Sequence, residues 1–267
     1  MDIILALTKE LNVEKWQVEA AVKLIDEGNT IPFISRYRKE ATGALNDEVL
    51  RNLNDRLTYL RNLEEKKTQV LSSIEEQGKL TEELKKQILE AQTLVVVEDL
   101  YRPYRPKRRT RATIAKEKGL EPLANIILLQ MTDKSLEEEA KAFVSEEKEV
   151  TTVEDAISGA KDIVAESISD KADYRSEIRE RTFRKGMLVS TAKKPEETSV
   201  YEKYYEYEER VEKMPGHRVL AINRGEKEKF LGVKIEVPAE EILGYLQREI
   251  ITRKNPNTQD ALKEAIE

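Results

Sequence analysis

Apolar residues recur every three or four positions along most of the chain, with polar and charged residues between them. This spacing gathers the apolar side chains on one face of an α-helix. The longest such stretch predicts a helix that begins at Asn46 or Asp47 and ends near Gln77, and a charged run at 64–67 interrupts its apolar stripe. At 1.5 Å per residue, a helix of about 30 residues spans roughly 45 Å. We therefore expect it to join two regions or to form the arm of a hairpin.

Three shorter helices are predicted ahead of the long one. The first covers residues 2–11, and Asn12 is the candidate N-cap of a second helix that ends at Gly28-Asn29. A third element follows Thr30 and ends near Thr42-Gly43. Three helices of this length are typical of a helix-turn-helix, although any small helical bundle has the same pattern. We predict a helix-turn-helix-like part over residues 1–45.

Helices separated by capping residues, glycines and prolines are predicted to continue to about residue 190. Thr81 begins one that runs into the apolar segment 94–97. This β-branched segment has the composition of a strand, but its position within a helical pattern favours a buried helix end. The remaining predicted helices cover 111–130 with breaks at Gly119 and Pro122, then 135–145, 153–170 and 171–185.

The pattern changes after residue 190. Residues 191–200 are polar and predict a loop, whereas 229–237 alternate apolar and polar positions and predict a strand. A single strand has no sheet to join, so we expect its partner segments to lie outside this chain. Helices are predicted over 217–227 and 240–252, and the last ten residues look like a helix cut short. The predicted fold class is mainly α, with at most a short strand near 229–237.

Composition narrows the chemistry that the chain can perform. It has 267 residues, no cysteine, and a single histidine, His217. Without cysteine, disulfides, thiol catalysis and cysteine zinc sites are excluded, and a histidine metal site would need a second histidine. No glycine-rich phosphate loop is present. We therefore expect no enzymatic activity, no metal site and no cofactor, and we interpret His217 as a packing or turn residue.

Charge and hydropathy bear on the compartment and on partners. The chain carries 46 basic and 52 acidic residues, a formal net charge of −6, and 37% of its residues are charged. It contains no apolar run long enough to span a membrane and no signal-peptide pattern at its start. We expect a cytoplasmic protein. A net negative charge argues against nucleic-acid binding by the whole surface, but it leaves room for a local basic patch.

The densest basic segment is YRPYRPKRRTR at 101–111, called the basic segment below. Its two prolines predict an extended backbone, from which the cations would fan out to contact phosphates while the tyrosines stack on bases. The alternative is that the arginines pair with acidic residues, such as the nearby Glu98 and Asp99. The candidate phosphate contacts are Arg102, Arg105, Lys107, Arg108, Arg109 and Arg111, and the candidate stacking residues are Tyr101 and Tyr104.

A second basic segment, PFISRYRKEATG, occupies 32–43. Arg36, Arg38 and Lys39 are candidates for a further phosphate contact beside the helix-turn-helix-like part. The simpler interpretation, which we favour, places Phe33, Ile34 and Tyr37 in the core and leaves the charges in solvent. The tyrosines at 201–207 lie among acidic residues that would repel phosphate, so we predict a core edge or a docking surface there.

Three segments together resemble the Tex family of bacterial transcription accessory proteins: TIPFISRYRKEATGAL, DLYRPYRPKRRTRATIAKEKGLEPLA and HRVLAINRGEKE. The resemblance extends in order over essentially the whole chain. It implies an N-terminal helical region, including a helix-turn-helix-like part, of a longer protein related in architecture to the eukaryotic elongation factor Spt-six. It also implies ribonuclease H-like, helix-hairpin-helix and S1 domains further on, with the S1 domain as the main nucleic-acid-binding module, and downstream partners for segment 229–237.

The resemblance suggests three parts: residues 1–45, a helical region 46–190 that holds the basic segment, and the start of a central region at 191–267. We expect association with RNA or DNA in the full-length protein, with the basic segment as an auxiliary contact. The phosphate role of the arginines rests on their chemistry alone, since the resemblance marks that segment only as a family signature. The alternative is a helical scaffold that docks proteins of the transcription machinery without binding nucleic acid.

Overall fold

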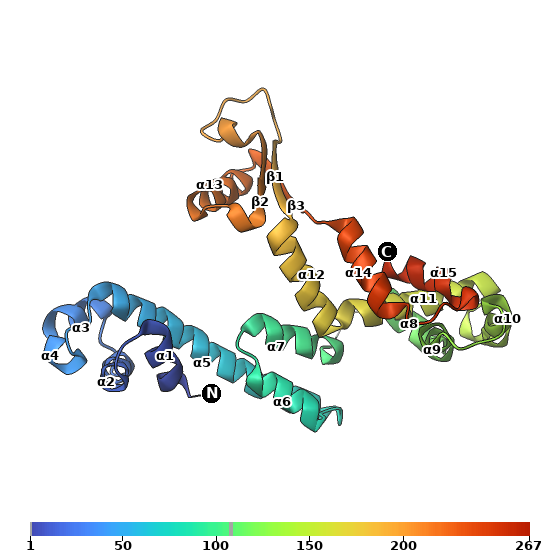
Figure 1. Ribbon diagram of the computed structural model, residues 1–267, viewed down its shortest axis with the longest axis horizontal. Coiled ribbons are helices and arrows are strands. Elements are labelled where there is room, and N and C mark those ends of the chain that lie inside the picture. Colours follow the sequence, from blue (N-terminus) through green and yellow to red (C-terminus); the bar gives the residue numbers. More distant parts are fainter. Residues whose placement is uncertain (1, 107–108) are drawn as a thin grey trace. The chain divides into compact units, whose positions relative to one another are not determined.

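Helices account for most of the backbone in the computed structural model, which describes residues 2–106 and 109–267 (Figure 1). The described residues form fifteen α-helices, several short 3₁₀ turns and one three-stranded sheet. The predicted mainly α fold is therefore confirmed. The chain divides into two compact units, Met1–Tyr104 and Arg105–Glu267.

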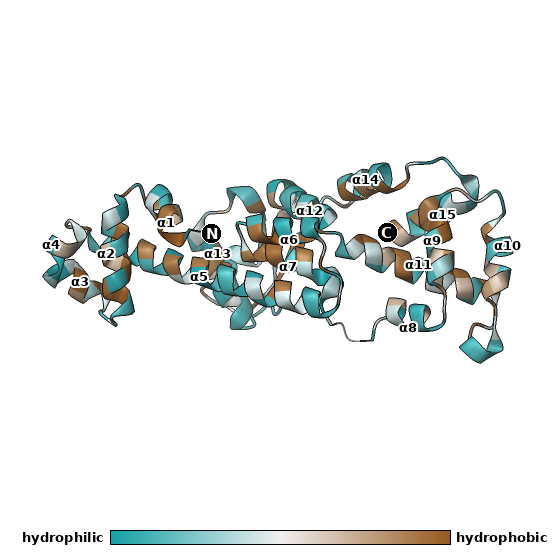
Figure 2. Cartoon of the chain, turned by 90° about the horizontal axis from the view of Figure 1, so that it is seen from below, coloured by the Kyte–Doolittle hydropathy of each residue, from teal (hydrophilic) through white to brown (hydrophobic). Residues whose placement is uncertain are grey.

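The first unit is organised around one long helix, α5 (Asp47–Glu76), as the spacing of its leucines predicted. Short helices pack against its first half, and the chain then turns back so that two more helices pack against its second half (Figure 1). Along α5, apolar and polar residues alternate in bands (Figure 2). The other helices are α1 (Ile3–Leu11), α2 (Lys15–Asp26), α3 (Ile31–Tyr37), α4 (Lys39–Thr42), α6 (Glu82–Glu90) and α7 (Leu94–Tyr101).

Capping residues set most helix starts in this unit, but two predictions were wrong. The side chains of Asn46 and Thr81 cap α5 and α6 as expected. Asn12 does not cap α2: it takes a left-handed φ of 51° and ends α1, while Glu14 caps α2 and exchanges hydrogen bonds with Gln17. Segment 94–97 is helical, as favoured over a strand, but it is not a buried helix end, because Thr93 caps a new helix there and only Val97 of that segment is buried.

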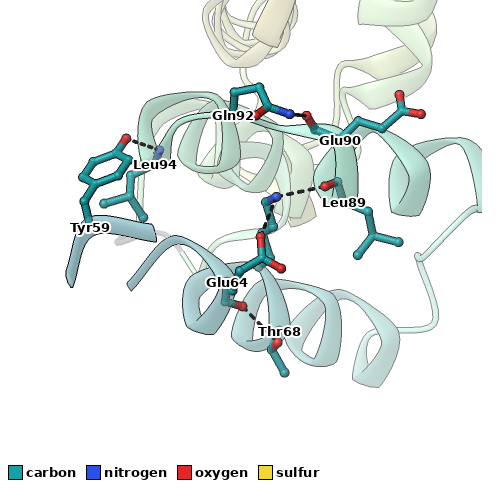
Figure 3. Close-up of polar contacts among 8 residues, drawn as sticks. Tyr59, Glu64, Thr68, Leu89, Glu90, Gln92 and Leu94 are labelled. Carbon is teal, nitrogen blue, oxygen red and sulfur yellow. Dashed lines mark hydrogen bonds and ion pairs between the residues drawn. The ribbon is translucent and has the colours of Figure 1, made fainter. Parts of the chain in front are cut away.

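The charged interruption in the α5 stripe holds a buried lysine. Lys67 is only 1% exposed. Its ammonium donates to the Leu89 carbonyl and pairs with Glu64 Oε1, each at 2.9 Å, along the two dashed lines that meet at one nitrogen in Figure 3. Leu89 lies in the last turn of α6, where carbonyls have no partner within the helix. Lys67 therefore fastens the end of α6 to α5.

The second unit packs its helices around α11 (Val153–Asp170), which the side chain of Thr152 caps. Helices from both ends of the unit's sequence contact α11 and share its apolar core, and α12 (Ala172–Lys185) leads from there to the sheet. The surrounding helices are α8 (Arg111–Glu117), α9 (Glu121–Leu129), α10 (Leu136–Ala140), α14 (Ala239–Ile250) and α15 (Pro256–Ile266). The predicted break at Gly119 separates α8 from α9, whereas Pro122 lies in the first turn of α9 and breaks no helix.

The predicted strand has its sheet partners within this chain. The antiparallel sheet has the order β2-β1-β3, with β1 (Met187–Ala192) in the centre, β2 (Glu206–Arg210) and β3 (Leu231–Glu236). Helix α13 (Gly216–Lys227) packs against β3. The expectation of partners outside the chain was wrong, as was the loop at 191–192. A short, charged strand such as β2 (EYEER) has few apolar residues, so the spacing of apolar residues did not predict the sheet.

Among the described residues, none of the helices combines the length and the apolar character that crossing a membrane requires.

Candidate nucleic-acid interface

The first unit holds the start of the basic segment in a fixed position. Tyr101 ends α7, and its hydroxyl lies 3.0 Å from Ser73 Oγ on α5. The Gln77 side-chain amide donates to the Tyr104 carbonyl at 3.0 Å. Both tyrosines are partly buried and pack against the core of this unit. Packing thus accounts for their positions, and their stacking on bases stays a prediction.

Pro103 does not extend the backbone as expected. Residues 102–104 form a 3₁₀ turn that continues α7, because the fixed φ of Pro103 is compatible with a helical turn. Arg102 and Arg105 are exposed, and each has an interaction partner. The candidates Lys107 and Arg108 lie outside the described residues.

The second unit presents the last two arginines of the segment on either side of a helix start. Thr110 caps α8 by accepting a hydrogen bond from the Thr113 amide at 3.0 Å. Arg109 pairs with Glu117 at 2.9 Å, and Arg111 lies 3.4 Å from Asp162. The two arginine side chains are 68% and 86% exposed. Solvent-exposed pairs of this kind contribute about 0–1 kcal/mol, so the arginines are held only weakly.

The second basic segment is more exposed than expected. Ile34 is buried, but Phe33 is 38% exposed and Tyr37 is 67% exposed, so the expected core positions of these two rings were wrong. The three cations Arg36, Arg38 and Lys39 are exposed as well. A seven-residue helix has room to bury only one face, and the short α3 buries Ile34 against α5 and turns both rings outward.

One neighbouring residue was missed by sequence reasoning. Trp16 on α2 is 52% exposed, and its ring lies against Gly43 at the end of α4. The signal was available, since Trp16 lies off the buried stripe of α2 that contains Val18, Ala21 and Val22. Helical spacing predicts that an aromatic residue outside the apolar stripe of its helix is exposed to solvent.

The segment around His217 adjoins a cluster of charged and aromatic side chains beside the small sheet. His217 is exposed at the start of α13. Its neighbour Arg218 pairs with Glu209 at 2.8 Å, and hydrogen bonds from Tyr207 and Arg218 lower the pKa of the Glu209 carboxyl. In the same tyrosine cluster, Tyr201 is buried and Tyr204 meets Tyr207 edge to face at 5.2 Å. Most of these groups build the core and edge of the small sheet.

Comparison with known proteins assigns the family. A model described as the Tex-like protein N-terminal domain matches residues 1–75. A second, described as Tex central region-like, matches residues 132–265. The chain belongs to the Tex family. The resemblance found in the three sequence segments is therefore confirmed.

Relatives of this Tex-family chain come from bacteria and animals. It is 48% identical to uncharacterized protein YdcI of Bacillus subtilis over 98% of its length and 37% of that protein. It is 41% identical to transcriptional accessory protein Tex of Neisseria gonorrhoeae over 88% of its length and 31% of that protein. A human S1 RNA-binding domain-containing protein 1 is 30% identical over 88% of the chain and 24% of that protein. The Tex-family chain thus spans between about a quarter and somewhat over a third of these relatives.

Proposed function

We propose that this Tex-family chain supplies auxiliary nucleic-acid contacts, to RNA or DNA, within a longer transcription accessory protein. The observation that supports this most directly is the exposure of Arg109 and Arg111 at the start of α8. Each arginine is held by one acidic partner through a pair whose guanidinium end is exposed to solvent, and a phosphate can replace such a partner at little cost. The names of the gonococcal and human relatives, which refer to transcription and to RNA binding, agree with this role.

Local charge is what would make such contacts possible. The chain as a whole carries a net charge of −6, which repels a polyanion. From Arg102 to Arg111 the sequence contains six cations and no acid. Binding should therefore be confined to a short stretch of phosphates and should weaken steeply as salt rises. In the full-length protein, we propose that domains beyond this chain make the main contacts.

Fluorescence anisotropy with labelled single- and double-stranded RNA and DNA tests the proposal. The wild-type chain and an Arg105/Arg108/Arg109→Ala variant are titrated at two salt concentrations. For single strands, the slope of log K against log salt falls by about 0.7 for every phosphate that the protein no longer neutralises, so removal of three arginines lowers it by about 2. We expect the variant to show weaker binding and this shallower slope.

A matched control separates the position of the charges from their number. Lys79, Lys85 and Lys86 are exposed cations around α6, so their triple substitution by alanine removes the same charge elsewhere. It should leave most of the affinity in place. Absence of binding by the wild-type chain at tens of micromolar, with the arginine variant less stable than wild type, would make the arginines structural ion-pair partners and refute the proposal.

A specific observation favours a second candidate, a helical scaffold for proteins. Leu89, Val95 and Val96 are 50%, 47% and 38% exposed on α6 and α7. Exposed apolar side chains close together in the sequence are typical of protein contacts. In that case the chain would bind no nucleic acid, but it would comigrate with purified RNA polymerase in gel filtration, and Val95→Ser/Val96→Ser would abolish this. In either role, we propose no enzymatic activity.

A further inference from the structure

We infer that one face of the first unit binds single-stranded nucleic acid, with aromatic rings stacking on bases and neighbouring cations contacting phosphates. This inference rests on the proposed nucleic-acid binding, and it adds the form of the nucleic acid and the residues that select it. To this face, called the aromatic–basic face below, we assign six exposed residues on or next to α2, α3 and α4, helices that contact one another: Trp16, Phe33, Arg36, Tyr37, Arg38 and Lys39.

The two rings on α3 form an exposed pair. Phe33 and Tyr37 are one helical turn apart, with ring centroids 5.4 Å apart and planes inclined by 44°. Ile34, the residue after Phe33, is fully buried and packs α3 against the core. The rings are thus carried outward by a helix that is itself anchored. Anchored, exposed aromatic rings are the elements on which bases of single strands stack.

Trp16 extends the face from α2 to the end of α4. A Cβ placed on Gly43 would lie 2.5 Å from Trp16 Cη2, so the indole rests directly on that glycine. The Gly43 amide donates to the Lys39 carbonyl, which places the indole one helical turn from Lys39. Gln17 fixes the arrangement, because its side-chain amide donates to the carbonyls of Thr42 at 3.1 Å and Gly43 at 3.2 Å.

The cations of this face are available to a ligand. In the described part of the chain, neither Arg36 nor Lys39 makes an ion pair. The Arg38 guanidinium lies 6.0 Å from the centroid of the Phe33 ring, at the outer limit of a cation–π contact. Segment 32–43 holds these three cations and one acid, Glu40, a net charge of 3 − 1 = +2 in a chain of net charge −6. A polyanion complements this charge, whereas an apolar protein surface does not.

The rings specify the form of the nucleic acid. In a duplex each base is stacked between its neighbours, so an exposed ring finds no free base to cover. A single strand offers free base faces, and removing one stacking ring typically weakens its binding about 10-fold. Cations alone would serve a duplex. The combination of three exposed rings with three cations therefore favours a single strand.

Substitution by leucine tests stacking without removing apolar surface. The full 267-residue chain and a Phe33→Leu/Tyr37→Leu variant are titrated with labelled oligo(dT), oligo(U) and a duplex of the same length. We expect the variant to bind the single strands about 10-fold or more weakly, with less than about a 2-fold change for the duplex. Phe183→Leu, which changes an exposed aromatic residue on α12, is the matched control and should bind as wild type does.

Intrinsic fluorescence supplies a second measurement on the same face. Trp16 is the only tryptophan in the chain, so its emission reports this surface alone. Single strands should quench it in a saturable way, with the same midpoint as in anisotropy, while the duplex should not. Circular dichroism of the leucine variant checks that α3 is intact.

The outcomes separate this inference from the proposed function. Single-strand binding that survives the leucine substitutions but is lost in the Arg105/Arg108/Arg109→Ala variant would overturn stacking and leave the proposed function standing. An equal loss for single strand and duplex, as expected of a duplex-binding helix-turn-helix, would also overturn it. No binding of either form by the wild-type chain would overturn both. Capture of a protein partner that tolerates leucine at both positions would reassign the face to protein docking.

Discussion

Lys67 is an ammonium group placed where the helix pattern calls for a leucine. Burying a charge is costly unless it is paired and hydrogen-bonded, and Lys67 satisfies both conditions through Glu64 and the Leu89 carbonyl. From the sequence, the run at 64–67 was visible as an interruption of the stripe. Its meaning was not, because the partner carbonyl lies 22 residues further along the chain and becomes a neighbour only when α6 folds back.

At the residue scale, replacement of Lys67 by methionine should destabilise the first unit. Methionine keeps most of the volume but removes the donor to the Leu89 carbonyl and one of the interaction partners of Glu64. We expect a loss of about 1–3 kcal/mol in the free energy of unfolding, measured by urea titration. Lys85→Met, at an exposed position on α6, should stay within about 0.5 kcal/mol of wild type. A stable Lys67→Met protein would mean that apolar packing fully replaces the ion pair.

At the scale of elements, the sequence predicted a helix start reliably where the residue at that start caps the helix with its own side chain. Asn46, Thr81 and Thr152 cap their helices with their own side chains, so the sequence was sufficient to place them. The sheet was harder, because β1 meets β2 and β3 only after intervening segments fold back, and the burial of a strand depends on those partners. The Asn12 error arose because asparagine serves both helix starts and left-handed helix ends.

The link between α2 and α4 yields a prediction at the same scale. Gly43 has a φ of +61°, and a Cβ there would meet Trp16 Cη2 at 2.5 Å. Gly28 has a φ of +86° with nothing within 4 Å of such a Cβ. Alanine at either position bears the strain of a left-handed backbone, but only at Gly43 does it also clash.

The pair of variants therefore measures the clash by difference. Gly43→Ala should lose about 1 kcal/mol or more beyond the loss in Gly28→Ala, by urea unfolding of each variant. Trp16 emission in the folded state should change in Gly43→Ala alone. Equal losses with unchanged emission would show that the indole swings aside freely, and that Gly43 serves only the backbone turn.

At the scale of the whole molecule, the sequence located the cations of the candidate sites but not their surroundings. Six arginines and lysines between 102 and 111 are visible in the sequence, whereas their exposure and ion pairs depend on residues distant along the chain, such as Asp162. Phe33 and Tyr37 were expected in the core because aromatic residues usually are. Their exposure follows from how little of α3 faces α5, which only the packed unit reveals.

At the same scale, the charged groups of the chain predict that its folded state loses stability in acid. Two arginines on α5 connect it to the helices before it. Arg61 donates two hydrogen bonds of 2.8 Å to the Asp26 carboxylate, and Arg56 Nη2 donates one of 2.8 Å to Glu10. The hydrogen bond from each arginine lowers the pKa of its carboxyl partner. A carboxyl with a lowered folded-state pKa contributes stability above its unfolded pKa, and that stability is lost as pH falls through the folded value.

The first unit should therefore unfold in acid, below a pH of about 4, as these carboxylates protonate. Protonation of all 52 acidic residues of the chain also leaves its 46 lysines and arginines to repel one another. Arg61→Gln removes the group that lowers the Asp26 pKa, so its acid midpoint, followed by circular dichroism, should move to higher pH. Arg51→Gln is the matched control, because Arg51 pairs with Asp47 within α5 and joins no second helix. If both variants shift equally, the midpoint reports total charge and not the links between helices. If Arg61→Gln shifts alone, the α2–α5 pair is the acid-sensitive link of this unit.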